Sequence, residues 1–271
     1  MKNLNGKTAV IVGGTGDIGL ATAKMFAESG AQVFISGRKL SHANERAKAL
    51  GPNGKGIQIA PSDEQDIKRA FEKIGAFDYL LVTLGTQSLT LPFAQLTDED
   101  YQKALNEKFF FYIRTMRAAM GMVRESITWL TGSAGRCAIP GLSNYGATCG
   151  ALHGALGALS MEIVPLRLNC VAAGLTKTDF WHKLQMSPQA QEEMYEGATG
   201  MIPVGLVAEP EDIAESLFFA ATNRYTTGTI LDTSGGMQLG RAMTSDKKLG
   251  FGAQARFGVR DDGLSRSKVT K

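Results

Sequence analysis

The stretch Gly13-Gly14-Thr15-Gly16-Asp17-Ile18-Gly19 follows directly on the apolar run Thr8-Ala9-Val10-Ile11-Val12. A strand, a glycine turn and then an amphipathic helix form the usual site for the pyrophosphate of a dinucleotide. Glycines let the backbone turn tightly and approach a phosphate, and a helix that begins near Asp17 would direct its free N–H groups at the anion. The turn therefore predicts a cofactor site with contacts from Gly13, Thr15, Gly16, Asp17, Ile18 and Gly19.

Short apolar runs alternate with helix-period segments along the rest of the chain, a pattern typical of a doubly wound parallel sheet. Strands are predicted near 8–12, 32–36, 56–60, 78–84, 126–131, 167–172 and 229–232. Helices are predicted near 17–29, 41–49, 64–74, 98–123, 144–164 and 210–222. The fold class is therefore α/β, a Rossmann-type doubly wound sheet in a single domain. The domain is expected over residues 1–240, with a basic C-terminal extension over 241–271.

Composition places the chain among ordinary globular proteins. The 271 residues are 44% hydrophobic and 20% charged, and no apolar run approaches the ~20 residues that cross a bilayer. The first seven residues lack the apolar centre of a secretory signal. Three cysteines without metal-ligand spacing favour reduced thiols. A cytoplasmic protein without membrane attachment is expected.

The charge is unevenly distributed. Residues 241–271 contain eight Lys or Arg and three Asp or Glu, whereas the whole chain has a formal charge of only +3. A solvated extension and an arm that crosses to another subunit both fit this composition. Nucleic-acid binding is not expected, because the basic run lacks interleaved aromatic residues.

Residues 178–205 interrupt the alternation of strands and helices directly after a predicted strand. The segment contains apolar side chains at Phe180, Trp181, Leu184, Met186, Met194, Tyr195 and Met201. Long loops at the carboxyl edge of a sheet often cover a pocket, so a mobile substrate lid is predicted here.

The chain resembles the short-chain dehydrogenase/reductase family over roughly residues 5–240. The resemblance rests on the glycine turn, Leu81-Val82-Thr83-Leu84-Gly85, Asn106, Tyr145, the stretch 167–174, and the closing Thr226-Thr227-Gly228 and Ser234-Gly235-Gly236. It implies the same fold, a nicotinamide cofactor and a catalytic tyrosine at Tyr145.

The family's Tyr-x-x-x-Lys element is altered in this chain. It begins at Tyr145, but Cys149 stands where the family has lysine. Residues four apart share a helix face, and the family's lysine lowers the pKa of the tyrosine and binds the nicotinamide ribose. A thiol can do neither, which indicates an atypical branch with a reduced catalytic set.

The family's catalytic serine is also displaced. The position 13 residues before Tyr145 is Gly132, so Ser133 is the candidate hydroxyl donor and Thr131 an alternative. With Tyr145 and Asn106, the resemblance implies the candidate catalytic set Tyr145, Ser133 and Asn106.

The residues that follow the second predicted strand bear on the choice of cofactor, and they favour NADP(H). The acid that binds an adenosine ribose diol in the family is replaced by Gly37, and Arg38 and Lys39 follow it. A guanidinium suits a 2′-phosphate. The resemblance implies that the nicotinamide is flanked by Leu84, Gly85, Tyr145, Gly174, Leu175, Thr176 and Thr178.

Two main functions remain open. The first is an NADP(H)-dependent reductase for a carbonyl or imine of a small apolar substrate. The second is a reductase-like scaffold without redox turnover, such as a cyclase, an isomerase or a nucleotide-binding pseudoenzyme; a purely structural subunit is a third possibility. A homodimer or homotetramer is expected, because the helices over 98–123 and 144–164 have more apolar surface than one sheet covers.

Overall fold

The structure is a computed structural model that describes residues 2–59, 64–85, 91–179 and 186–240. A seven-stranded parallel sheet with the order β3-β2-β1-β4-β5-β6-β7 forms its centre. The strands are β1 (Thr8–Val12), β2 (Gln32–Gly37), β3 (Gly54–Gln58), β4 (Phe77–Val82), β5 (Val123–Gly132), β6 (Arg167–Ala173) and β7 (Ile230–Thr233). The strand order reverses between β1 and β4, which is where a doubly wound sheet binds its ligand.

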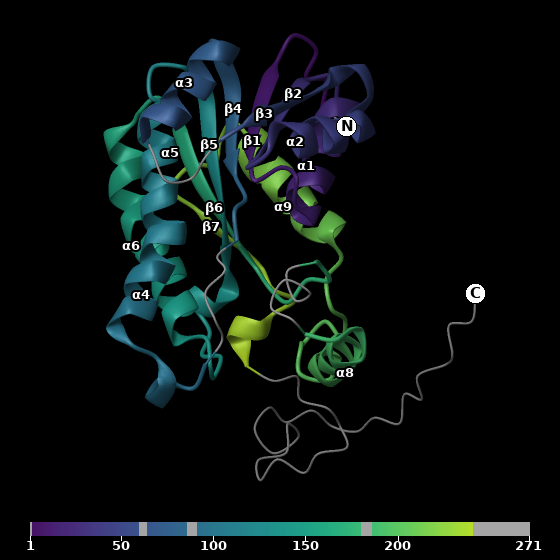
Figure 1. Ribbon diagram of the computed structural model, residues 1–271, viewed down its shortest axis with the longest axis vertical. Helices are drawn as coiled ribbons and strands as arrows, with labels where there is room; N and C mark the ends of the chain where they lie inside the picture. Colours follow the sequence, from purple (N-terminus) through teal and green to yellow (C-terminus); the bar gives the residue numbers. More distant parts are fainter. Residues whose placement is uncertain (1, 60–63, 86–90, 180–185, 241–271) are drawn as a thin grey trace, which may run out of the picture.

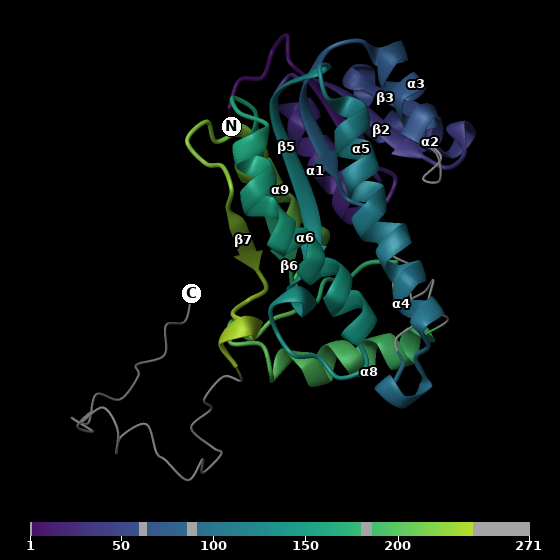
Figure 2. The ribbon, with the colours of Figure 1, turned by 90° about the vertical axis from the view of Figure 1, so that its left-hand side faces the viewer.

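Helices cover both faces of the sheet (Figures 1 and 2). One layer contains α1 (Asp17–Glu28), α2 (Leu40–Ala47) and α9 (Pro210–Thr222). The other contains α3 (Glu64–Ile74), α4 (Asp98–Leu105), α5 (Phe111–Ala119) and α6 (Ser143–Glu162). This arrangement confirms the predicted Rossmann-type single domain.

An apolar core lies on each face of the sheet. Under α3, α5 and α6 it includes the fully buried Trp129, Phe71 and Phe111, and under α1 and α9 it includes Phe26 and Ile35. Both faces of the central strands are covered, so β1 and β4 are largely apolar along their length instead of alternating between apolar and polar residues. The rigid sheet fixes the positions of the strand ends that carry the candidate site.

The prediction of one uninterrupted α-helix over 98–123 is wrong. The structure divides this segment into α4, a π-helical turn over Asn106–Phe110, and α5, which ends at Ala119. Gly121 adopts a φ of +83°, which reverses the chain into β5 at Val123. A positive φ favours glycine and ends the helix at this point.

The helix α8 (Pro188–Thr199) lies near the carboxyl ends of the strands, outside both helical layers (Figure 1). Tyr195, Ile202 and Val207 form a small apolar cluster there, against which Leu175 packs. This cluster joins the predicted lid segment to the loop after β6. The predicted lid residues Phe180, Trp181 and Leu184, and the basic extension 241–271, lie outside the described residues.

No helix in the described ranges combines the length and apolarity needed to cross a membrane.

Candidate active site

The glycine turn after β1 packs tightly against the loop after β4. Gly13 has a φ of +88°, and a Cβ built there would lie 3.0 Å from the Leu84 nitrogen and from Thr83 Oγ1. At Gly19 a Cβ would lie 2.6 Å from the Gly13 carbonyl oxygen. These positions therefore require glycine, and the turn brings β1 and β4 together where the strand order reverses.

The amino end of α1 faces out of this turn without a side-chain cap. Gly16 is the N-cap residue and makes no side-chain cap hydrogen bond. Asp17, in the first turn, directs its carboxylate elsewhere: it accepts from the Asp179 backbone N–H at 2.8 Å and lies 3.6 Å from the Arg46 guanidinium. The first-turn N–H groups suit a phosphate, and Arg46 offsets part of the repulsion from Asp17.

At the end of β2 the missing side chain of Gly37 makes room for Thr15 of the glycine turn. A Cβ at Gly37 would lie 3.1 Å from the Thr15 methyl carbon. Arg38 and Lys39, which follow, are both exposed. Two cations thus stand beside the glycine turn, available to an anionic ligand.

The candidate nicotinamide residues lie at the ends of β4 and β6. Leu84 is half-buried and Gly85 exposed after β4. Gly174 leaves β6 next to Ser234, whose Cα would be 2.7 Å from a Cβ on residue 174. Thr176 is buried and donates its hydroxyl to the Gly174 carbonyl at 3.0 Å. Leu175 and Thr178 are half-buried on the same loop.

Tyr145, in the first turn of α6, rests on the end of β5. A Cβ built on Gly132 would lie 2.6 Å from the Tyr145 hydroxyl oxygen and 2.7 Å from Cε1. The Tyr145 ring therefore fills the space of a side chain at residue 132, the position at which the family's spacing places serine. Burial raises the pKa of Tyr145 well above its usual value, and the neighbouring Cys149 raises it further.

Cys149 fits closely where the family has a lysine. Its side chain is fully buried, and its sulfur accepts a hydrogen bond from the Gly132 N–H at 3.3 Å. A Cβ at Gly135 would lie 2.8 Å from the Cys149 Cβ. The contact between α6 and the turn after β5 thus requires small residues, and Cys149 fits this close packing.

The two candidate hydroxyl donors have different surroundings. Ser133 is buried in the short 3-10 turn that follows β5. The Thr131 hydroxyl instead points into the interior, 2.8 Å from His153 Nε2 and 3.1 Å from the Cys170 sulfur. Burial lowers the pKa of His153, and the charges of Arg136 and Lys108 lower it further. The Thr131 hydroxyl is thus hydrogen-bonded to neighbouring side chains within the protein interior.

The π-helical turn brings Lys108, not Asn106, to the site. Asn106 is exposed, whereas only 1% of Lys108 is accessible. The Lys108 ammonium donates to the carbonyl of Leu84 at 2.9 Å and to that of Leu130 at 3.1 Å. It also lies 5.8 Å from the centre of the Tyr145 ring. Sequence reasoning missed Lys108, although a lysine directly before the run Phe109-Phe110-Phe111 was an available signal.

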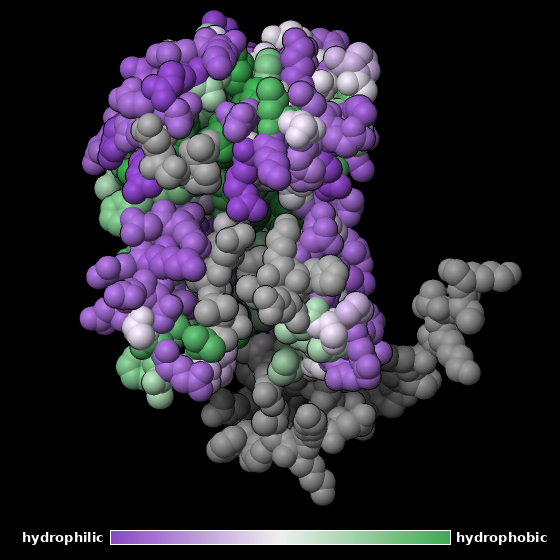
Figure 3. Space-filling model, viewed as in Figure 1, coloured by the Kyte–Doolittle hydropathy of each residue, from purple (hydrophilic) through white to green (hydrophobic). Residues whose placement is uncertain are grey.

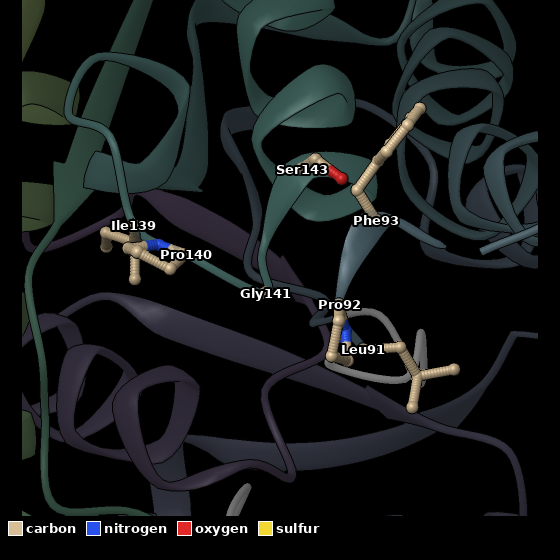
Figure 4. Close-up of a pocket in the computed structure, with 7 residues that line it drawn as sticks. All are labelled: Leu91, Pro92, Phe93, Ile139, Pro140, Gly141 and Ser143. Carbon is tan, nitrogen blue, oxygen red and sulfur yellow. The ribbon is translucent and has the colours of Figure 1, made fainter. Parts of the chain in front are cut away.

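An apolar pocket of about 710 Å³ adjoins the first turn of α6 (Figure 4). Ile139 and Pro140 lie across it from Leu91 and Phe93. Ser143, two residues before Tyr145, also lines the pocket, and its hydroxyl lies 2.7 Å from that of Tyr101 on α4. In the space-filling view most of the outer surface is hydrophilic, and hydrophobic residues show between the hydrophilic ones at the upper centre and again at the lower end of the molecule (Figure 3).

The chain is similar to known reductases over most of its length. The family described as enoyl-(acyl carrier protein) reductase matches residues 14–238. A 3-oxoacyl-[acyl-carrier-protein] reductase FabG of Rickettsia typhi is 31% identical over 253 residues, covering 88% of this chain and 99% of the relative. Carbonyl reductase family member 4 of Danio rerio is 29% identical and covers 86% of this chain and 98% of its own.

Solved structures agree with this similarity. A small-chain dehydrogenase in complex with NADPH is 28% identical, with a TM-score of 0.75 over 86% of this chain and 99% of its own. The MalC reductase/Diels-Alderase of Malbranchea aurantiaca is 25% identical, with a TM-score of 0.78 over 87% of this chain and 97% of its own.

Proposed function

Because this chain belongs to the short-chain dehydrogenase/reductase family, we propose that it is an NADP(H)-dependent reductase of a carbonyl or imine on a small apolar substrate. The observation that carries the proposal is the convergence of three features at one edge of the sheet. These are the uncapped amino end of α1, the exposed Arg38 beside it, and Tyr145 at the end of β5.

The cofactor would be held by groups that the fold already orients. The glycine turn and the first turn of α1 would bind the pyrophosphate, and Arg38 with Lys39 would bind the 2′-phosphate. Leu84, Gly85 and the loop over 174–178 would flank the nicotinamide, which supplies a hydride when bound. This arrangement favours NADP(H) over NAD(H), because Gly37 offers no carboxylate to a ribose diol.

Tyr145 is the proton donor in this proposal. While the substrate carbon takes up hydride, the Tyr145 O–H bond breaks and its proton passes to the substrate oxygen or nitrogen. Ser133 would hydrogen-bond the same substrate atom. The raised pKa of Tyr145 keeps its hydroxyl protonated near neutral pH, as an acid requires, but makes it a weak acid. An imine or iminium substrate needs little activation and suits such a site.

The substrate class follows from the pocket beside α6. The pocket is lined mainly by the apolar side chains of Leu91, Phe93, Ile139 and Pro140. Ser143, two residues before Tyr145, adds a polar group to the lining. An apolar substrate would be bound by burial of its surface, while the hydroxyl groups orient the reacting end. The segment around α8, packed on Leu175, would cover the nicotinamide side of the site.

A scaffold without redox turnover, such as a cyclase or isomerase, is the second candidate. One observation favours it: the Tyr145 ring is packed onto Gly132, and its neighbour Cys149 supplies no positive charge. In that case the pocket would orient a substrate for a reaction that needs positioning alone.

The test is NADPH oxidation at 340 nm with a panel of apolar and polar ketones, aldehydes and cyclic imines. The proposal expects turnover with apolar members and a reduced product. Binding of NADPH without oxidation across the panel would favour the scaffold function.

A further inference from the structure

Lys108 is a buried lysine to which the proposed mechanism assigns no step. Its three hydrogen-bond partners in the described part of the chain are oxygen atoms: the carbonyls of Leu84 and Leu130, and the Tyr112 hydroxyl at 3.3 Å. The Tyr112 hydroxyl lies 2.6 Å from the Leu130 carbonyl and can donate its proton there. Three acceptors match the three donors of an ammonium, so the site favours the charged form, although burial lowers the pKa of Lys108.

Among the described residues this positive charge has no fixed counter-ion. In the described part of the chain, Lys108 forms no ion pair with a carboxylate. A buried cation without an anion is costly, and a protein rarely keeps one without a use for it. The groups facing Lys108 are the rings of Tyr112 and Tyr145, at 4.9 and 5.8 Å, and the thiols of Cys149 and Cys170.

Lys108 also lies between the two parts of the proposed site that would hold the nicotinamide and the proton donor. Its two carbonyl partners belong to the loop after β4, which would flank the nicotinamide, and to β5, which supports Tyr145. The π-helical turn between α4 and α5 places its side chain there. Such turns are frequent at functional sites.

We propose that Lys108 is a positioning residue that supplies, from another helix, the positive charge that Cys149 cannot provide to Tyr145. The inference rests on the proposed function. When Tyr145 gives its proton to the substrate, the electron pair of the O–H bond remains on the tyrosine oxygen. The Lys108 ammonium stabilises that negative charge through the low-dielectric interior.

The kinetic test is Lys108→Met, which removes the charge and keeps an unbranched side chain. We expect kcat for reduction to fall at least ~10-fold, because the charge acts on the transition state, while the KM for NADPH changes less than about twofold. Lys103→Met is the matched control, because Lys103 is an exposed lysine five residues earlier. It should retain wild-type kcat. An unchanged kcat in folded Lys108→Met would overturn the inference.

A second readout does not depend on turnover. The ¹³Cζ resonance of Tyr145, identified by its loss in Tyr145→Phe, is followed from about pH 7 to about pH 11 in wild type and in Lys108→Met. Deprotonation that begins at lower pH in wild type supports the inference. Identical curves, two flat curves included, overturn it and leave Lys108 as a structural strut.

If Lys108→Met does not fold, Lys108→Gln replaces it in both tests. The glutamine amide can still donate hydrogen bonds to the two carbonyls but has no charge. If wild type does not oxidise NADPH at all, the proposed function fails, whereas the resonance comparison still decides the role of Lys108.

Discussion

The Tyr145 hydroxyl occupies the space that a side chain on Gly132 would need, since a Cβ there would lie 2.6 Å from the hydroxyl oxygen. A serine at residue 132 would match the family's spacing, but it would displace the ring of the proposed proton donor. Gly132→Ser should therefore lower the free energy of unfolding by about 1–3 kcal/mol, the usual cost of overpacking. It should also lower reductase activity.

The measurements are urea denaturation and NADPH oxidation. Gly154→Ser, on the helix α6 that carries Tyr145, is the control, because a Cβ at Gly154 meets nothing within 4 Å. Wild-type stability and activity in Gly132→Ser would mean that Tyr145 is not fixed against β5.

Cofactor choice is expected to depend on Arg38. NADPH should raise the melting temperature of the wild type more than NADH does at equal concentration. Arg38→Asp should reverse that order, because it removes a charge-assisted partner of the 2′-phosphate and adds repulsion, a loss of roughly tenfold to a hundredfold in NADPH affinity. Arg124, an exposed arginine at the amino end of β5, provides the control Arg124→Asp. Equal shifts by the two cofactors in the wild type would contradict this assignment.

Stability should fall in mild acid because of His153. Burial lowers the pKa of this half-buried side chain below its usual 6.5, so the folded state favours the neutral ring. The corresponding stability is complete above the unfolded-state pKa and is lost as the pH falls through the lower folded-state value. His153→Gln should reduce the difference in unfolding free energy between pH 7.5 and pH 5.5, conditions that bracket about 6.5. His42→Gln, which changes an exposed histidine, should not. The same pH dependence in wild type and His153→Gln would count against this interpretation.

Assembly is expected through the layer of α4, α5 and α6. The structure places Phe111 and Tyr112 in the core, but Phe110 is 44% and Met161 75% exposed. Light scattering at micromolar concentration should give a multiple of the 29.0 kDa protomer mass. Phe110→Asp should lower that mass, because a buried charge opposes association. Phe219→Asp, on α9 in the other layer, should leave it unchanged. A monomeric wild type would refute the expected oligomer.

The fold was predictable because most strands contain an apolar run and glycines mark the turns that matter. Gly13 and Gly19 are required by close backbone contacts that the glycine spacing already indicated. The long helix over 98–123 was not resolved correctly, because a π-helical turn keeps the apolar pattern while it shifts which side chains face inward.

The candidate site was less predictable from the sequence, because the same π-helical turn changes which side chains face the site. The family resemblance indicates Asn106, yet the π-helical turn exposes Asn106 and buries Lys108. The occupation of the Gly132 position by the Tyr145 ring is a tertiary contact between residues 13 apart, which no local pattern reveals. Cys149, in contrast, is a small buried residue whose sulfur contacts β5, and the glycines around it in α6 are a sequence signal for such close packing.

The rate of NADPH oxidation at 340 nm by wild type and by Tyr145→Phe, with the best apolar imine or ketone, tests the central claim most directly. Tyr145→Phe retains the ring that fills the space above Gly132 and removes only the proposed proton donor. We predict turnover by the wild type. The rate of the variant should be lower by ~10²-fold or more, which is the usual effect of losing a positioned acid. Tyr225→Phe, at a side chain that is 99% exposed, should match the wild type. An unchanged rate in Tyr145→Phe would contradict the account.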